Sequence, residues 1–269
     1  MRADDGGACF DEVGPMKRLD GRIAVVTGAG SGIGRATSIA LAQRGCSVAI
    51  VDMQPAGAEE TAEMVRAHGP RASVHLADVR DPNRMDELPA EVAEALGPCQ
   101  ILINNAGVTA AGAFTDESLE DLHWIVDINV WGVIHGCRAF LGMLGDADEA
   151  HIVNMSSMVG LLGLPHNVSY SLTKGAVRAF SEALRGELVT SNVGLTVVFP
   201  GAIHTNITSN ARGGQGARLA DMGRSRLAPY VMRPPSVVAN KIVSAIERDR
   251  PRVVVGPDAH VLSVLTRAL

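Results

Sequence analysis

The chain has few of the features that mark several large classes of protein. Aromatic residues make up only 3% of its 269 residues and the net charge is −5 at pH 7, which argues against a nucleic-acid-binding surface with stacking platforms and a basic groove. The four cysteines include no Cys-x-x-Cys pair, so we expect reduced thiols in a cytoplasmic protein. The eight histidines show no metal-binding spacing, and we expect no metal site.

Long apolar runs are also missing. No stretch reaches the roughly 18 consecutive apolar residues of a membrane span, and the N-terminal stretch carries Asp4, Asp5, Asp11 and Glu12 without the apolar core of a signal peptide. We therefore expect no contact with a membrane. Residues 1–18 are predicted to be a flexible N-terminal extension, followed by a single domain over residues 19–269.

Short apolar runs rich in β-branched residues alternate with amphipathic helical patterns along the chain. The buried strands are expected at residues 23–26, 46–51, 72–76, 101–103, 151–155, 195–199 and 253–255. Helices are expected between them, the longest over residues 118–144. This alternation predicts an α/β fold, a doubly wound seven-stranded parallel sheet of the Rossmann type in a single domain.

A glycine-rich turn follows the first expected strand. Gly28, Gly30, Gly32 and Gly34 lie within seven residues and lead into a helical pattern. The backbone N–H groups of such a turn, together with the N-terminus of the helix, are suited to binding phosphate. A tight turn that binds nothing also uses glycine, and Ile33 stands where the strict Gly-x-Gly-x-x-Gly pattern requires its third glycine.

An acidic residue lies at the end of the second expected strand. Asp52 follows the glycine turn at close to the roughly 20-residue spacing of an acid that accepts a hydrogen bond from an adenosine ribose. Its carboxylate would repel a 2′-phosphate, and Ser31 stands in the turn where a basic residue would attract one. The pattern therefore favours NAD over NADP. Arg35, just inside the helix, is the one basic residue that keeps NADP as an alternative. Without the glycine turn, we would interpret Asp52 as a helix cap or as a solvent-exposed residue.

Further polar residues lie at the ends of later strands and on helices. The run at residues 104–107, Asn-Asn-Ala-Gly, ends a parallel strand, where ligands of open α/β sheets bind, although turns also use these residues. Asn129 interrupts an apolar helical run, for which an exposed position is the alternative explanation. Tyr170 and Lys174 are four residues apart and share one helix face. By themselves they would also fit a solvated helix without a function. Ser157 lacks the Gly-x-Ser-x-Gly context of a serine hydrolase.

In combination, these motifs resemble the short-chain dehydrogenase/reductase family in its classical-length branch. The resemblance covers residues 20–256 and rests on Thr27-Gly28-x-x-x-Gly32-x-Gly34, Asn104-Asn105-Ala106-Gly107, Asn129, Ser157, Tyr170-x-x-x-Lys174 and Pro200-Gly201. It implies a catalytic tetrad of Asn129, Ser157, Tyr170 and Lys174. It also implies cofactor contacts from Gly28, Ser31, Gly32, Ile33, Gly34, Asp52, Asp78, Val79, Asn105, Ala106, Gly107, Tyr170, Lys174, Pro200, Ile203 and Thr205.

The resemblance implies an NAD-dependent oxidoreductase that moves a hydride between nicotinamide and a secondary alcohol or ketone. Tyr170 is the expected base, with Lys174 and the positive nicotinamide favouring its phenolate. Ser157 is expected to hold the substrate oxygen, and Asn129 a water next to Lys174. The alternative is a non-catalytic, cofactor-sensing regulatory protein on the same fold. Such a protein could lose Tyr170 or Lys174 without harm, whereas this chain keeps all four tetrad residues.

Three segments are expected to line the substrate pocket, at residues 109–114, 158–166 and 203–229. They are rich in Leu, Met, Ala and Gly, which favours an apolar or ring-bearing small-molecule substrate. The last segment combines glycines with apolar residues and is predicted to be a lid over the site, with a disordered insertion as the alternative.

The helices expected at residues 118–144 and 168–191 carry apolar residues on more than one face, among them Trp124 and Trp131. Such a surplus marks a surface that contacts a partner. The resemblance implies pairing through these helices, and we expect a homotetramer, with a dimer as the fallback.

Overall fold

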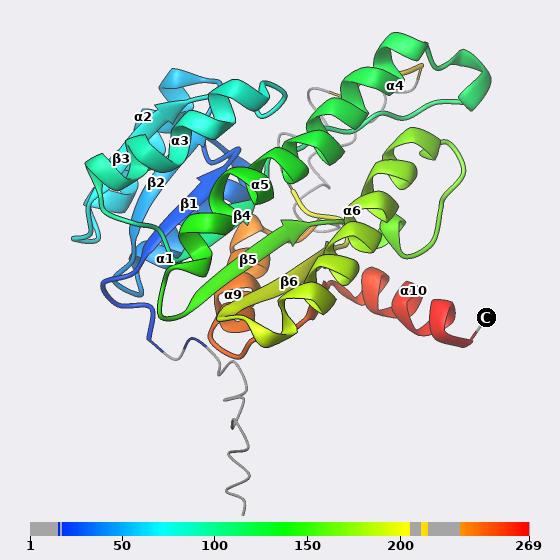
Figure 1. Cartoon of the computed structure of the whole chain (residues 1–269). Helices are drawn as coiled ribbons and strands as arrows, with labels where there is room; N and C mark the ends of the chain where they lie inside the picture. Colours follow the sequence, from blue (N-terminus) through cyan, green and yellow to red (C-terminus); the bar gives the residue numbers. More distant parts are fainter. Residues whose placement is uncertain (1–15, 17, 205–210, 215–231, 269) are drawn as a thin grey trace, which may run out of the picture.

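The structure is a computed structural model that describes residue 16 and residues 18–204, 211–214 and 232–268. Its sheet has seven strands, which all pair in parallel in the order β3-β2-β1-β4-β5-β6-β7 (Figure 1). They are β1 (Ile23–Thr27), β2 (Ser47–Asp52), β3 (Ala72–Leu76), β4 (Ile101–Asn104), β5 (Ala150–Met155), β6 (Val193–Pro200) and β7 (Arg252–Val255). The predicted doubly wound fold is confirmed, with strand ends shifted by one or two residues.

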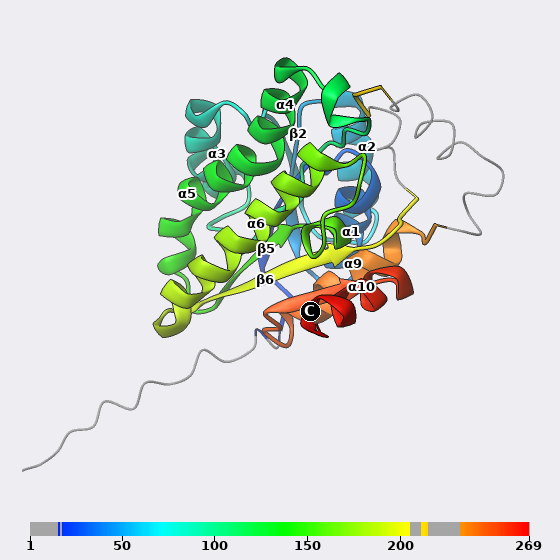
Figure 2. The ribbon, with the colours of Figure 1, turned by 90° about the vertical axis from the view of Figure 1, so that its right-hand side faces the viewer.

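Helices cover both faces of this sheet (Figure 2). One core cluster joins the sheet to α1 (Gly32–Ala42), α2 (Pro55–Arg66) and α9 (Pro235–Ile246). The other joins it to α3 (Pro82–Ala95), α5 (Gly132–Gly145) and α6 (Val168–Glu187). The helix α10 (Pro257–Ala268) follows the last strand. None of the described helices has both the length and the apolar character that a membrane crossing requires.

The first strand shows why the sequence forms a buried sheet. Ala24 and Val26 belong to one core cluster, whereas Ile23 and Val25 belong to the other, because successive side chains of a strand point to opposite faces. A continuous apolar run therefore suits a parallel strand covered on both sides. The chain order reverses at β1, which lies between β2 and β4, and ligands of open α/β sheets bind in the crevice at such a point.

The long helix expected over residues 118–144 is present, but it is not α-helical throughout. A π-helical turn, Asp127–Trp131, lies between α4 (Leu119–Val126) and α5, and Gly132 N donates to Asp127 O across it. One extra residue in the hydrogen-bonded ring widens the helix here. Asn129 lies in this turn and is fully buried, so the alternative of an exposed Asn is wrong.

The beginning of the domain lies earlier than expected. Met16 is buried in the core cluster that also contains Leu19, although residue 16 falls in the stretch predicted to be a flexible extension. Residues 1–15 and 17 lie outside the described part of the chain. Burial of an apolar side chain against the sheet stabilises the fold by about 1.5–3 kcal/mol, which explains why Met16 packs with the domain.

Candidate active site

The glycine turn after β1 is packed too closely for side chains. Gly28 and Gly32 have φ values of 61° and 55°, a left-handed conformation that glycine adopts without strain. A Cβ on Gly28 would lie 2.8 Å from the Cα of Ala106, and one on Gly34 would overlap the carbonyl oxygen of Gly28. The turn therefore contacts its own first residue and the loop after β4 through backbone atoms.

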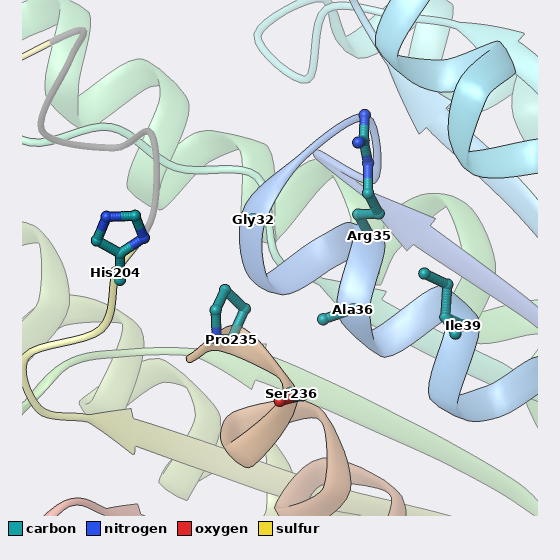
Figure 3. A pocket seen from close by; sticks show the side chains of 7 residues that line it. All are labelled: Gly32, Arg35, Ala36, Ile39, His204, Pro235 and Ser236. Atoms are coloured by element: carbon teal, nitrogen blue, oxygen red, sulfur yellow. The ribbon is translucent and has the colours of Figure 1, made fainter. Parts of the chain in front are cut away.

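The helix α1 starts at this turn without a side-chain cap. Ser31 is its N-cap residue, yet its hydroxyl makes no cap hydrogen bond, and the first N–H groups of a helix have no partner within the helix. A hollow of about 380 Å³ opens beside it, between α1 and the first turn of α9 (Figure 3), lined by Gly32, Arg35, Ala36, Ile39, His204, Pro235 and Ser236. An uncapped helix N-terminus beside a hollow fits the pyrophosphate of a dinucleotide.

Asp52 and Arg35 both contact the turn, but in different ways. The carboxylate of Asp52 accepts hydrogen bonds from Gly30 N (2.8 Å) and Gln54 N (2.9 Å), which hold it at the carboxyl end of β2. The guanidinium of Arg35 donates to Gly30 O (2.6 Å) and to the carboxylate of Glu60 (2.6 Å), and in Figure 3 it points away from the hollow. Arg35 is thus paired within the protein, which leaves Asp52 as the charge beside the expected ribose site.

The loop after β4 is fastened to the glycine turn by Thr27. Its hydroxyl oxygen accepts from Asn105 N (3.0 Å) and Ala106 N (3.1 Å). In return, the side-chain amide of Asn105 donates to the carbonyl oxygens of Thr27 (2.9 Å) and Gly28 (3.1 Å). Asn105 therefore shapes the turn. Thr27 was not among the predicted site residues, and its position at the end of β1, directly before the turn, is the signal that could have found it.

The four residues of the expected tetrad come together at the carboxyl ends of β4 and β5. Ser157 follows β5, and its hydroxyl lies near enough to Tyr170 of α6 to lower the pKa of that phenol. Lys174, one turn further along α6, is buried and donates from Nζ to Met155 O at 3.0 Å, with Nζ 5.8 Å from the centre of the Tyr170 ring. A Cβ on Gly107 would lie 3.1 Å from Asn129 Oδ1 and 3.4 Å from Lys174 Nζ.

The side chain of Asn129 joins the loop after β4 to α6. Its Oδ1 accepts from Val108 N (2.8 Å), and its Nδ2 donates to Val108 O (2.9 Å) and to the hydroxyl of Thr173 (3.1 Å). These bonds give the amide a structural task beside Lys174, and the expected water next to Lys174 stays a prediction. Thr173 was missed by the sequence reasoning, although it directly precedes Lys174.

Burial sets the protonation of the two ionisable residues of the tetrad. Removal from water lowers the pKa of Lys174 to about 8, because it disfavours the ammonium form. The same effect raises the pKa of Tyr170, and the Ser157 hydroxyl acts in the opposite direction. The sequence led us to expect a lowered pKa for Tyr170. In the protein by itself, burial raises this pKa instead.

The position of Lys174 is also fixed through its backbone. Ser156 donates from its hydroxyl to the carbonyl oxygen of Lys174 at 2.7 Å. A Cβ on Gly160 would lie 2.6 Å from that same carbonyl oxygen and from the Ser156 hydroxyl. The short turn after β5 therefore packs directly on α6. Neither Ser156 nor Gly160 was predicted, because nothing in the local pattern shows which helix they contact.

Other expected cofactor residues make contacts within the protein. The carboxylate of Asp78 binds the guanidinium of Arg80 (2.6–3.0 Å), which lowers the pKa of that carboxyl. Val79 is buried, and Ile203 packs its side chain into the core, so contacts with a cofactor would involve their backbones. Thr205 lies outside the described residues, as does most of the segment predicted to be a lid.

The sequence of residues 22–216 matches the sequence model of the family described as short chain dehydrogenase. The chain belongs to the short-chain dehydrogenase/reductase family. It is 34% identical to an oxidoreductase named SadH from Mycobacterium tuberculosis over 259 residues, which are 94% of this chain and 93% of that protein. It is 30% identical to HetN, a ketoacyl reductase of Nostoc sp., over 89% of this chain and 80% of that protein.

A solved structure of this family has the same fold. It is a short-chain dehydrogenase/reductase from Burkholderia phymatum in complex with NAD, with a TM-score of 0.85 and 30% sequence identity, covering 93% of this chain and 94% of that chain. Membership of the short-chain dehydrogenase/reductase family makes this chain an oxidoreductase. Among the residues that the structure describes, no group of His, Cys, Asp and Glu side chains is arranged to hold a metal ion.

Proposed function

We propose that this protein is an NAD-dependent oxidoreductase that transfers a hydride between nicotinamide and a secondary alcohol or ketone. The observation that carries the proposal is the placement of Ser157, Tyr170 and Lys174 at the same sheet edge as the uncapped N-terminus of α1. The NAD complex of the Burkholderia phymatum relative supports the cofactor. The ketoacyl reductase HetN supports a carbonyl or alcohol substrate.

Different residues of the crevice would bind different parts of NAD. The N-terminus of α1 and the backbone of the glycine turn would bind the pyrophosphate, and Asp52 would accept from the hydroxyls of the adenosine ribose. The negative charge of Asp52 would repel a 2′-phosphate, which favours NAD over NADP. When bound, NAD supplies the acceptor of the hydride. The remaining chemistry is proton transfer, which side chains of the protein would carry out.

Three side chains would divide the work on the substrate oxygen. The Ser157 hydroxyl donates a hydrogen bond to it and holds it beside Tyr170. The Tyr170 phenolate takes the hydroxyl proton when the alcohol is oxidised, and the phenol returns it when the ketone is reduced. The ammonium group of Lys174 favours the phenolate by its charge. Because the pKa of Lys174 is about 8, this charge is present at neutral pH.

We further propose an apolar or ring-bearing substrate, a cytoplasmic location and a homotetramer, with a dimer as the fallback. Residues 19–269 would form the one catalytic domain, with Met16 packed into its core. Exposed apolar side chains on the helices expected to pair support the assembly, because such surfaces mark protein contacts. Trp131 is 49% exposed before α5, and Val168 and Leu172 of α6 are 45% and 57% exposed.

The test is NAD reduction, followed by absorbance, with a panel of secondary alcohols. Tyr170→Phe should lower turnover by about 10²–10⁴-fold, the usual contribution of a general base, and leave the Kd for NAD nearly unchanged. Oxidation should become faster as the pH rises towards about 8, because the base must be deprotonated while Lys174 keeps its charge. Lys174→Met should also impair turnover, whereas Lys241→Met, a change at an exposed lysine of α9, should not. NAD binding without turnover of any alcohol or ketone would support the sensing alternative instead.

A further inference from the structure

The loops that follow β4, β5 and β6 are joined to one another through their backbones. Gly112 N donates to His166 O (3.0 Å), and Ala111 N donates to Arg212 O (3.0 Å). Arg212 N donates to Thr109 O (3.2 Å), and Ala110 and Arg212 form a parallel β-bridge. Because backbone polar groups need hydrogen-bond partners, each loop depends on the others for its conformation. We call these three connected segments, residues 109–112, 164–167 and 211–214, the loop frame.

The side chain of Arg212 fastens the loop frame to α4. Its guanidinium donates to the carboxylate of Asp121 (3.1 Å) and lies over the ring of Trp124, with Cζ 4.2 Å from the ring centre. In Figures 1 and 2 the short gold segment that contains Arg212 lies beside α4. Arginine is suited to combining an ion pair with stacking on an aromatic ring. Its charge is therefore engaged within the protein.

The loop frame is tied to the catalytic residues at two points. The two hydrogen bonds between Asn129 and Val108 fix the chain directly before Thr109. The 164–167 segment ends at the N-cap of α6, the helix that carries Tyr170. The turn after Arg212 is also tight, because Gly213 has a φ of 92° and a Cβ there would lie 2.6 Å from Ala111 O. A displacement of Arg212 would thus reach the edge of the site.

We propose that Arg212 is a positioning residue, which holds the loop frame in place at the substrate side of the site and so sets the affinity for the alcohol or ketone. The inference rests on the proposed function for its substrate. Arg212 acts here through residues 109–112 and contacts neither NAD nor substrate. An arginine beside a pocket could instead bind a substrate carboxylate directly, but the contacts with Asp121 and Trp124 leave this guanidinium engaged.

The first experiment measures the loop frame itself, by hydrogen exchange in the full chain. Arg212→Ala should make the amides of Ala111 and Gly112 exchange about tenfold faster, since it removes an ion pair and a cation–π contact. Arg66→Ala is the matched control, because Arg66 also makes one surface ion pair, with Glu59, and its side chain is 45% exposed against 42% for Arg212. Equal exchange of these two amides in both variants would overturn the proposal.

The second experiment separates positioning from direct binding, with 1-phenylethanol and mandelate as neutral and carboxylate-bearing secondary alcohols. Arg212→Ala should raise KM about tenfold for both, change kcat by less than about twofold, and leave the Kd for NAD unaltered. Arg212→Lys should give an intermediate KM, because it keeps the charge and loses the stacking.

Other results would contradict this role of Arg212. A rise in KM for mandelate alone would show direct binding of the carboxylate, and an unchanged KM for both alcohols would show that the loop frame does not set affinity. If the unmodified protein oxidised no alcohol of the panel, the proposed function would fail, and the exchange comparison would still decide whether Arg212 holds the loop frame.

Discussion

Replacing Asp52 by Asn tests the basis of cofactor choice with the smallest change of shape. The Asp52 carboxylate is held by Gly30 N and Gln54 N at 2.8 and 2.9 Å. A Cβ on Gly30 would lie only 2.9 Å from its Cγ, so the two residues are in close contact. An amide has almost the same size but only one acceptor oxygen, so Asp52→Asn removes the charge and keeps one of the two hydrogen bonds, which reach different carboxylate oxygens.

The expected magnitudes follow from the loss of that charge. A hydrogen bond to a charged acceptor contributes about 1.5–3 kcal/mol against about 0.5–1.5 for a neutral one, so NAD should bind about tenfold more weakly. For NADP the sign is opposite. Two unit charges about 4 Å apart interact by about 4 kcal/mol near a protein surface, and Asp52 is only half-buried. Relief of this repulsion should tighten NADP binding by about 10–100-fold.

Calorimetry with NAD and NADP measures both effects. The unmodified protein should bind NAD much more tightly than NADP. Asp52→Asn should raise the Kd for NAD and lower the Kd for NADP, so that the two values become more similar. The control is Asp148→Asn, which makes the same change of charge at an exposed residue paired with Arg22 at the amino end of β5. If the unmodified protein bound NADP as tightly as NAD, or if the ratio of the two Kd values were the same in the Asp52 variant, the reasoning would be refuted.

Two further predictions concern stability and assembly. Burial lowers the pKa of His151 to about 4, whereas the unfolded chain binds that proton near pH 6.5, so the free energy of unfolding should fall by about 3 kcal/mol as the pH drops from 6.5 to 4. When the free energy of unfolding is measured by urea unfolding across this pH range, His151→Gln should remove most of this loss, and the exposed His68→Gln should not. An equal dependence of this free energy on pH in both variants would contradict the attribution to His151. Light scattering should give about four times the 28.1 kDa of the chain, with smaller species for Trp131→Glu, and a monomer mass would rule the assembly out.

The sequence by itself determined the fold and the types of residue at the site. Apolar runs covered on both faces and alternating with helical patterns leave a doubly wound parallel sheet as the favoured arrangement. The carboxyl ends of parallel strands meet at one edge, so the glycine turn, Asp52 and Ser157 had to lie near one another. The four-residue spacing of Tyr170 and Lys174 placed both on one face of α6. Each of these inferences depends on short-range patterns, which a sequence carries in full.

Only the tertiary structure decided which partner each polar side chain has. The periodicity of residues 118–144 shows a helix but cannot show the π-helical turn that buries Asn129 against Thr173. Likewise, the position of Arg35 in the sequence allowed contact with a 2′-phosphate, and its ion pair with Glu60 became visible only when α1 and α2 were packed together. The pairing of Arg212 with Asp121 and Trp124 joins segments that are far apart in the chain. Such contacts depend on ångström-scale distances between packed elements, because hydrogen bonds and ion pairs weaken steeply with separation, and residue type and spacing do not encode those distances locally.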